Sequence, residues 1–324
     1  MAGCGSPSRE YAEAVAHEHG HGHGHAHHHH GPAADADRRW LGVALGVIAT
    51  FMVVEVVAGI LADSLALLSD AAHMLTDAGA IAIALYAARL AARPAAGRFT
   101  FGLGRAEILS AQGNGATLLV LAGVIAVEAI RRLWSAPDVD GGFELVVGLL
   151  GACANIGAAM ALGKAERRSL NVEGARAHGL TDLYASLAAA TAGAVVLVTG
   201  FDRADAIASL VVAALMLRSG VLLLRAAGRV LLEGAPEGVD PQAVGHALAA
   251  YPGVVEVHDL HIWEVTSGFP ALAAHVLVAP GDDCHGVRRA LQSMVGERFG
   301  IEHVTLQVDH APAGDRLLEI EPRR

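Results

Sequence analysis

Aromatic and charged residues are scarce in this chain of 324 residues. Aromatic side chains make up 4% of it and charged side chains 17%, whereas 53% of the residues are hydrophobic. A soluble domain carries more charge than this, and a chain held wholly in a membrane carries less. The composition therefore predicts a membrane part joined to a soluble part.

Basic residues and cysteines are also few. The formal net charge is −10 and the arginines are scattered instead of forming a basic stripe, so we expect no nucleic-acid partner. The three cysteines, Cys4, Cys153 and Cys284, have no C-x-x-C spacing, which argues against a disulfide framework and a thiolate zinc site. We expect no cleavable signal, because the first forty residues lack an apolar core.

Histidine, in contrast, is concentrated near the N-terminus. Nine histidines lie between His17 and His30, and residues 1–39 offer nothing to bury. We expect a disordered cytoplasmic tail whose imidazoles capture divalent metal weakly, with a purely solubilising tail as the alternative. The histidines assigned to this accessory capture are His19, His21, His23 and His25.

A metalloprotease pattern, H-E-x-x-H, also occurs in this tail at His17, Glu18 and His21. The pattern binds zinc only when an ordered helix points both histidines at one ion. Glycines at alternate positions disfavour that helix. An intramembrane metalloprotease is therefore kept only as a rival hypothesis.

Apolar segments of helical length follow from Trp40, and about 20 residues suffice to cross a bilayer. The predicted spans are 40–62, 64–92, 105–133, 143–166, 175–200 and 204–226. Six spans place both termini on one side, and most arginines beside the spans select that side as the cytoplasm. Arg131 and Arg132 go against this rule. We expect a multi-pass protein of the inner (plasma) membrane.

The composition changes after Gly234, where Pro236 and Pro241 mark a boundary. The sequence predicts a helix at 240–250, strands at 254–265 and 271–278, a helix at 283–299 and a strand at 303–309. This α-β-β-α-β order is typical of a small ferredoxin-like domain.

The expected fold class is an α-helical membrane protein with six transmembrane helices, followed by a cytoplasmic α+β ferredoxin-like domain. The expected domains are a tail at 1–39, a membrane domain at 40–234, a cytoplasmic metal-binding domain at 235–312 and a disordered tail at 313–324.

Two copies of the pattern H-x-x-x-D lie inside apolar segments. His73 and Asp77 form the first copy, and His178 and Asp182 form the second. Residues four apart share one face of a helix, so two such helices would offer four nitrogen and oxygen ligands, the number that zinc takes. The alternative is that hydrogen bonds between these side chains lock the two helices together.

The chemistry of such a site couples metal to protons. Two aspartates neutralise a dication, and without it they leave costly charge in a poorly hydrated cavity. Histidine binds metal only as the neutral ring, and its usual pKa is about 6.5. A site that opens alternately to the two sides would therefore exchange a cation for protons. Imidazole with carboxylate suits zinc, cobalt and cadmium better than magnesium or calcium.

Histidines are also dense in the soluble part, together with Asp259, Cys284 and Asp309. Imidazole is the commonest metal ligand, so this group predicts metal binding as a whole, although each member alone is more simply a surface histidine. His258 and His261 are three residues apart in a predicted strand, so they need a bulge to reach the same face.

Several separate motifs resemble the cation diffusion facilitators, specifically their zinc-transporting branch, along nearly the whole chain. They are ADSLALLSDAAHMLTD at 62–77, RFTFGLGRAEIL at 98–109, the second H-x-x-x-D at 178–182, VHDLHIW at 257–263, AAHV at 273–276 and HVTLQVD at 303–309. The resemblance implies a homodimer that exports cytosolic zinc against protons.

The resemblance also implies roles for individual residues. The transport site is His73, Asp77, His178 and Asp182. The cytoplasmic-domain ligands are His258, His275, His285 and Asp309, with His261 as an alternative and Gln307 where some relatives have histidine. Arg105 and Glu233 resemble a charge pair near the dimer seam.

We therefore expect a proton-coupled antiporter in the lipid bilayer, with Zn²⁺ as substrate and regulatory ligand and with no organic cofactor. It is not expected to be an enzyme. The rival from another class is a membrane metal sensor or store that does not transport, which leaves the paired intramembrane motifs unexplained.

Overall fold

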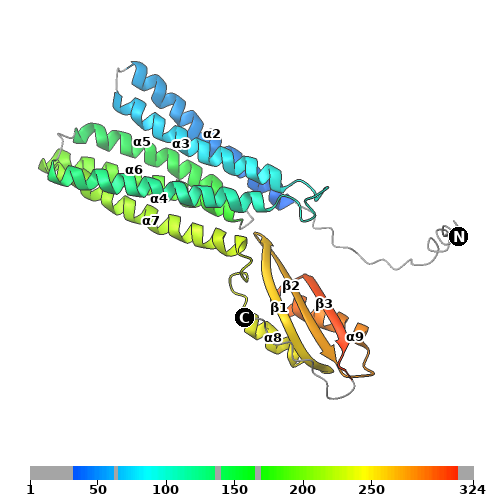
Figure 1. Cartoon of the computed structure of the whole chain (residues 1–324). Helices are drawn as coiled ribbons and strands as arrows, with labels where there is room; N and C mark the ends of the chain where they lie inside the picture. The colour runs from blue at the N-terminus through cyan, green and yellow to red at the C-terminus, as the bar shows by residue number, and fades with distance from the viewer. Residues whose placement is uncertain (1–31, 62–64, 136–139, 165–168, 313–324) are drawn as a thin grey trace, which may run out of the picture. The chain divides into compact units, whose positions relative to one another are not determined.

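The computed structural model describes residues 32–61, 65–135, 140–164 and 169–312, with only the backbone described at some positions of the first two helices. These ranges contain six long helices (Figure 1). They are α2 (Pro32–Leu61), α3 (Leu65–Ala91), α4 (Arg105–Trp134), α5 (Gly141–Gly163), α6 (Leu170–Thr199) and α7 (Arg203–Leu231).

Four of these helices, α4 to α7, are long and apolar enough to cross a membrane. The other two contain shorter apolar stretches in their described parts, Arg39–Val54 in α2 and Ala78–Ala91 in α3. The structure therefore has a helical membrane domain with four clear spans, and the count of six spans remains a prediction.

Helix α6 begins five residues earlier than the apolar pattern predicted. The side chain of Ser169 accepts a hydrogen bond from the backbone N–H of Val172, at 3.2 Å, and so caps the helix. The first turns of α6 also contain polar residues such as Asn171, which is fully buried between helices. The apolar pattern thus placed the start of this helix too late, because its first turns are stabilised by a cap and by tertiary contacts and not by an apolar run.

Glycines set how closely α5 and α6 approach. A Cβ atom placed on Gly148 would lie 2.6 Å from the backbone nitrogen of Ala190, and one on Gly193 would lie 2.6 Å from that of Leu145. Such contacts leave no room for any side chain, so the two backbones touch along this seam. Gly115 and Gly220 play the same part between α4 and α7, where a Cβ on Gly220 would lie 2.9 Å from the Gly115 carbonyl oxygen.

The C-terminal part consists of α8 (Pro241–Ala249), β1 (Val254–Thr266), β2 (Phe269–Val278), α9 (Cys284–Phe299) and β3 (His303–His310). Their order is the predicted α-β-β-α-β order. The sheet has the order β1-β2-β3, with β1 antiparallel and β3 parallel to β2.

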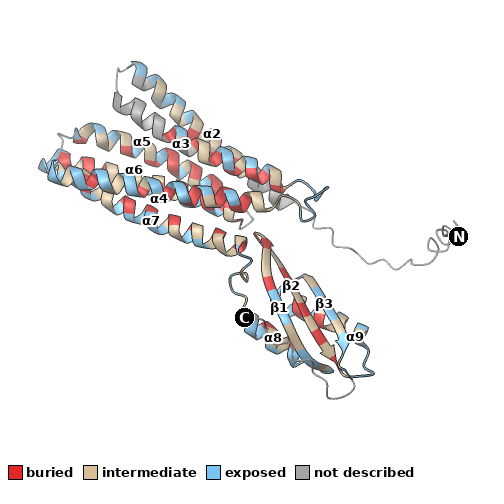
Figure 2. Cartoon of the chain, viewed as in Figure 1, coloured by how far each residue is buried: buried red, intermediate tan, exposed pale blue. Residues whose placement is uncertain are grey.

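One face of this sheet forms a core with α8 and α9. Alternate residues of β2, namely Leu272, Ala274, Val276 and Val278, are buried there together with Leu248 of α8 and Leu291 of α9. Figure 2 shows the buried positions along β2 and on the helices of the membrane domain. The residues between them on β2, including His275, lie on the other face of the sheet.

A β-bulge interrupts β1 between His258 and His261. His258 pairs with His275 of β2, whereas His261 pairs with Ala273, so three steps on β1 match two steps on β2. The extra residue lies near Asp259, whose φ of +50° is uncommon for a residue with a side chain. Because Ala273 and His275 share a face, the bulge brings His258 and His261 to that same face, which a regular strand could not do.

Candidate metal sites

A buried histidine, His178, lies beside Asp182 on α6, and the Asp182 side chain is 18% exposed. His178 is 3% exposed, and its Nε2 lies 3.8 Å from Oδ2 of Asp182 on the next helical turn. Ligand atoms of one tetrahedral zinc lie about 3.3 Å apart when each is 2.0–2.1 Å from the ion. A small side-chain adjustment would therefore let both residues bind one cation.

The register between α3 and α6 places the other predicted pair at the same depth. The Nδ2 of Asn171 donates a hydrogen bond to the carbonyl oxygen of Ala84 on α3, at 2.7 Å. Helices joined by short connections alternate in direction, so α3 and α6 run oppositely (Figure 1). His178 follows Asn171 by seven residues and Asp77 precedes Ala84 by seven, which moves about 10 Å in the same direction on both helices.

The remaining members of the two pairs, Asp182 and His73, also lie at equal distances along their helices from the Asn171–Ala84 hydrogen bond. Asp182 lies eleven residues beyond Asn171, and His73 lies eleven residues before Ala84. Each pair is therefore level with the other along the bundle. The side chains of His73 and Asp77 lie outside the described residues, so the comparison rests on the backbone of α3.

A chain of two hydrogen bonds links the backbone of Asp182 to α5. The hydroxyl of Ser186 donates to the carbonyl oxygen of Asp182, at 2.9 Å, and Nδ2 of Asn155 on α5 donates to the Ser186 oxygen, at 3.2 Å. Asn155 is thus engaged in helix packing between α5 and α6.

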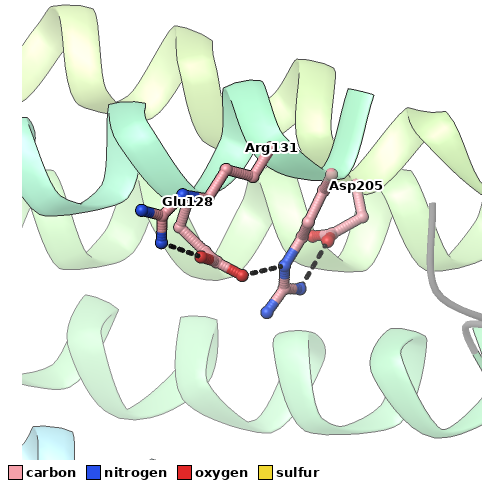
Figure 3. A network of polar contacts seen from close by, with 4 residues as sticks. Glu128, Arg131 and Asp205 are labelled. Atoms are coloured by element: carbon pink, nitrogen blue, oxygen red, sulfur yellow. Dashed lines mark hydrogen bonds and ion pairs between the residues drawn. The ribbon is translucent and has the colours of Figure 1, made fainter. Parts of the chain in front are cut away.

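Four charged residues form a network between α4 and α7 (Figure 3). Arg132 lies 3.2 Å from Glu128 on its own helix and 3.1 Å from Asp205 on α7, and Arg131 lies 3.9 Å from Glu128. Arg131 and Arg132 lie on the side of the membrane where arginines are predicted to be few. The carboxylates of this network compensate their charges, which explains why they are tolerated at this end of α4. Sequence spacing reveals the pair within α4 but not the pair with Asp205.

Arg105 and Glu233 lie next to each other at the ends of α4 and α7. Their side chains are 3.3 Å apart, and Nε of Arg105 donates to the carbonyl oxygen of Val265 on β1, at 3.1 Å. Both side chains are substantially exposed, so the pair contributes little stability by itself. Its place at a dimer seam stays a prediction.

Three residues on the open face of the sheet could hold a metal ion. One nitrogen of His258, one of His275 and a carboxylate oxygen of Asp259 all lie within 4.8 Å of one another. The Nδ1 of His275 lies 3.6 Å from Oδ2 of Asp259. These donors fit zinc, whose ligands are imidazole nitrogens and carboxylate oxygens with about 3.3 Å between them.

Asp259 is a candidate ligand that the sequence pattern left out of the predicted site. Its neighbours in HDLH gave a signal, but a regular strand would turn Asp259 away from His258. Only the bulge and the positive φ bring its carboxylate to the two histidines.

The other predicted ligands of this domain are placed less closely. Gln307 of β3 pairs with His275 and donates to Oδ2 of Asp309 at 2.9 Å, which puts Asp309 on the same sheet face two residues further along. His285 is exposed in the first turn of α9. Among the described residues, His258, Asp259 and His275 form the group of three whose ligand atoms all lie within 4.8 Å of one another. The tail histidines, including His19, His21, His23 and His25, lie outside the described residues.

Comparison with known proteins divides the chain in two. Residues 41–232 match the cation efflux transmembrane domain, and residues 236–311 match the cytoplasmic domain of cation efflux proteins.

Three curated relatives cover most of the chain. The metal cation efflux system protein CzcD of Cupriavidus metallidurans is 39% identical over 278 residues, covering 85% of this chain and 88% of that protein. The zinc transporter ZitB of Escherichia coli is 39% identical over 280 residues, covering 86% and 89%. A cadmium, cobalt and zinc/H(+)-K(+) antiporter of Bacillus subtilis is 36% identical over 279 residues, covering 85% and 89%.

A solved structure is also similar in sequence. The metal-bound C-terminal domain of the CzcD transporter from Cupriavidus metallidurans is 39% identical and covers 22% of this chain and 97% of that domain, with a TM-score of 0.21.

Proposed function

Because the chain belongs to the cation efflux (cation diffusion facilitator) family, we propose that it exports Zn²⁺ from the cytosol in exchange for protons by alternating access. The proposal places residues 40–234 in the inner membrane as six spans, with both termini, the tail at 1–39 and the metal-binding domain at 235–312 in the cytoplasm. The names of relatives support zinc as cargo, with cobalt and cadmium as further candidates.

The buried pair His178–Asp182 carries this proposal. His178 is 3% exposed and lies beside a carboxylate on an apolar helix, so the pair lowers the stability of the membrane domain. Ionisable residues placed in this way usually mark a functional site. The level backbone positions of His73 and Asp77 on α3 support a set of four ligands, the number that zinc takes. The alternative role, hydrogen bonds that hold the two helices together, does not require two histidine–aspartate pairs at the same depth.

Proton exchange follows from the charges of this set. A bound dication balances Asp77 and Asp182, and its departure leaves two carboxylates with little water around them. Protons that enter from the outer side restore the balance, and metal that enters from the cytosol displaces them. The name of the Bacillus subtilis relative includes proton exchange, which supports this part of the proposal.

The cytoplasmic domain senses metal in this proposal. Zinc held by His258, Asp259 and His275, with His261, His285 and Asp309 as further ligands, would stabilise the exporting form of a homodimer. The Arg105–Glu233 pair joins α4 to the segment after α7, and the proposal places this pair near the seam between protomers.

Zinc flux in proteoliposomes tests the transport site. His178→Ala and Asp182→Ala should each lower proton-coupled flux by about 100-fold or more, because each removes a ligand that protein elsewhere in the bundle cannot replace. Thr191→Val is the matched control on α6, since the Thr191 hydroxyl is exposed and donates to the Leu187 carbonyl oxygen on its own helix. Undiminished flux in either site variant would refute the proposal.

The alternative of a sensor or store without transport predicts a different outcome. Such a protein would bind zinc but show no flux even as the wild type. Relatives named as efflux proteins and transporters favour transport.

A further inference from the structure

One face of α7 is exposed along much of the helix. Its members follow one another at steps of four and three residues, the spacing that keeps side chains on one face of a helix. They are Val211, Leu215, Arg218, Leu222 and Arg225. The helix packs on α4 through another face, where Gly220 meets Gly115. Contact with lipid accounts for the three apolar members of the exposed face, but it does not account for the two arginines.

Arg218 lies inside the apolar part of α7. It is the only charged residue between Asp205 and Arg225, which are twenty residues apart. Twenty helical residues extend about 30 Å, which equals the thickness of the hydrocarbon core of a bilayer. Arg218 precedes Arg225 by seven residues, so its backbone lies about 10 Å inside this core.

Neither Arg218 nor Arg225 forms an ion pair with a side chain that the structure describes. Other arginines near the ends of α4 and α7 differ in this respect. Arg105, Arg132 and Arg229 each lie within 3.3 Å of a carboxylate oxygen. Charged side chains inside a membrane are costly and are normally paired. The charge of Arg218 therefore requires an anion that the described residues do not supply.

Bending of the Arg218 side chain toward water relieves only part of this cost. Long basic side chains bend toward the nearer membrane surface, which for Arg218 is the surface at the C-terminal end of α7. The Cα–Cβ bonds of a helix tilt toward its N-terminus, so the side chain leaves the backbone in the opposite direction. A phosphate group that enters from the C-terminal end would meet the guanidinium groups of Arg218 and Arg225.

A second copy of the chain fits this face less well than a lipid does. In a dimer whose two-fold axis is parallel to the membrane normal, equivalent residues lie at the same depth. Contact through this face would bring two copies of Arg218 together in surroundings of low dielectric constant, where like charges repel strongly. A lipid phosphate has the complementary charge, and its acyl chains suit Val211, Leu215 and Leu222.

We propose that Arg218 and Arg225 bind the phosphate of an anionic phospholipid from the cytoplasmic leaflet, whose acyl chains lie along Val211, Leu215 and Leu222. The inference rests on the six-span orientation in the proposed function, which places the C-terminal end of α7 at the cytoplasmic surface. Basic groups at this surface attract anionic lipids. Arginine suits the site because its planar guanidinium can donate two parallel hydrogen bonds to one phosphate.

Thermal unfolding of the full-length protein in detergent tests this site. Phosphatidylglycerol should raise the unfolding midpoint of the wild type by about 2–4 °C more than phosphatidylcholine does. Arg218→Leu should lose this additional rise. Without added lipid the variant should be at least as stable as the wild type, because leucine suits an apolar surface. Arg218→Lys should retain part of the rise, since it keeps the charge without the planar group.

Arg93→Leu is the matched control. It removes the same charge at an exposed position in the loop after α3, and it should keep the full response to phosphatidylglycerol. An equal response in the wild type and in Arg218→Leu would overturn the proposal. Loss of the response in Arg93→Leu as well would also overturn it, because the lipid would then act through the overall charge.

Cross-linking distinguishes a lipid from a second copy on this face. Leu222→Cys is introduced into a variant that lacks Cys4, Cys153 and Cys284, and the protein is oxidised in proteoliposomes. No disulfide between two copies should form, because lipid covers this position. A disulfide between copies would show that the face meets another protomer and would overturn the proposal.

Zinc flux separates the lipid site from the proposed function. Wild-type flux together with an equal lipid response in Arg218→Leu would refute the lipid site alone. Absence of flux in the wild type, together with a lipid response that Arg218→Leu loses, would refute transport and support the lipid site.

Discussion

His178 and His275 each lie beside a carboxylate, but the two pairs are built differently. On α6 the pair comes from helical spacing alone, its side chains are 4% and 18% exposed, and the facing atoms lie 3.8 Å apart. In the cytoplasmic domain a cross-strand histidine pair is completed by Asp259 at a bulge, and the side chains of His275 and Asp259 are 45% and 66% exposed. In the proposed mechanism the poorly hydrated site on α6 exchanges metal for protons, whereas the open site on the sheet can gain or lose metal in water at little electrostatic cost.

The largest loss of stability and flux is expected from a change in the close contact between α5 and α6, because α6 carries His178 and Asp182. Gly148→Val would push a side chain into the backbone of α6, at a cost of about 3 kcal/mol, and should abolish flux. Thermal unfolding and zinc flux measure the two consequences. Gly163→Val is the control on the same helix, because a Cβ there meets nothing within 4 Å. Equal stability of the two variants would contradict the close seam.

Loss of one ligand from the exposed cluster of His258, Asp259 and His275 should reduce zinc flux far less than loss of a ligand on α6. His275→Ala should weaken zinc binding by the cytoplasmic domain about 10- to 100-fold, because a central ligand is lost. Flux at saturating zinc should persist. Isothermal titration of a protein that lacks residues 1–31 and carries His178→Ala removes the tail histidines and disables the proposed transport site, and an unchanged affinity on adding His275→Ala would remove His275 from the cluster.

Asp259 offers a sharper version of the same test. Asp259→Gly keeps the positive φ and relieves its strain, so any loss of zinc affinity, expected at about tenfold, reports the carboxylate alone. Asp309→Ala serves as the comparison. If only the Asp309 variant loses affinity, the cluster at the bulge is not the binding site.

The smallest effect concerns the start of α9. The backbone N–H of Gly286 donates to Oδ1 of Asp283 at 2.9 Å and holds the pKa of this carboxyl below its usual range. This stabilisation is present above the unfolded pKa of about 3.9 and is lost as the pH falls through the lower folded value. Asp283→Asn should therefore remove a small part of the acid sensitivity of unfolding, as seen by circular dichroism. An identical pH profile would exclude this contribution.

Local signals predicted much of the fold. In the cytoplasmic domain, prolines, glycines and alternating apolar residues placed each element within two residues of its observed bounds. The second H-x-x-x-D likewise predicted the contact between His178 and Asp182, because helical spacing fixes it.

What the sequence could not provide depends on contacts between distant residues. The start of α6 depends on Ser169 and on Asn171 reaching Ala84, and the charge compensation of Arg132 depends on Asp205. The position of the bulge decides which side chains join His258, and it arises from strand register rather than from the residues at the bulge alone.

The glycine seam between α5 and α6 also limits how the bundle can change. Because a Cβ on Gly148 or on Gly193 would lie 2.6 Å from a backbone nitrogen of the other helix, any shift that brings a larger residue to one of these positions would make the helices clash. The next position that would fit again is a full turn away, about 5.4 Å along the axis. Such a slip would move His178 and Asp182 out of level with α3. The seam thus favours one register of α5 on α6, and we expect these two helices to move together when the bundle opens.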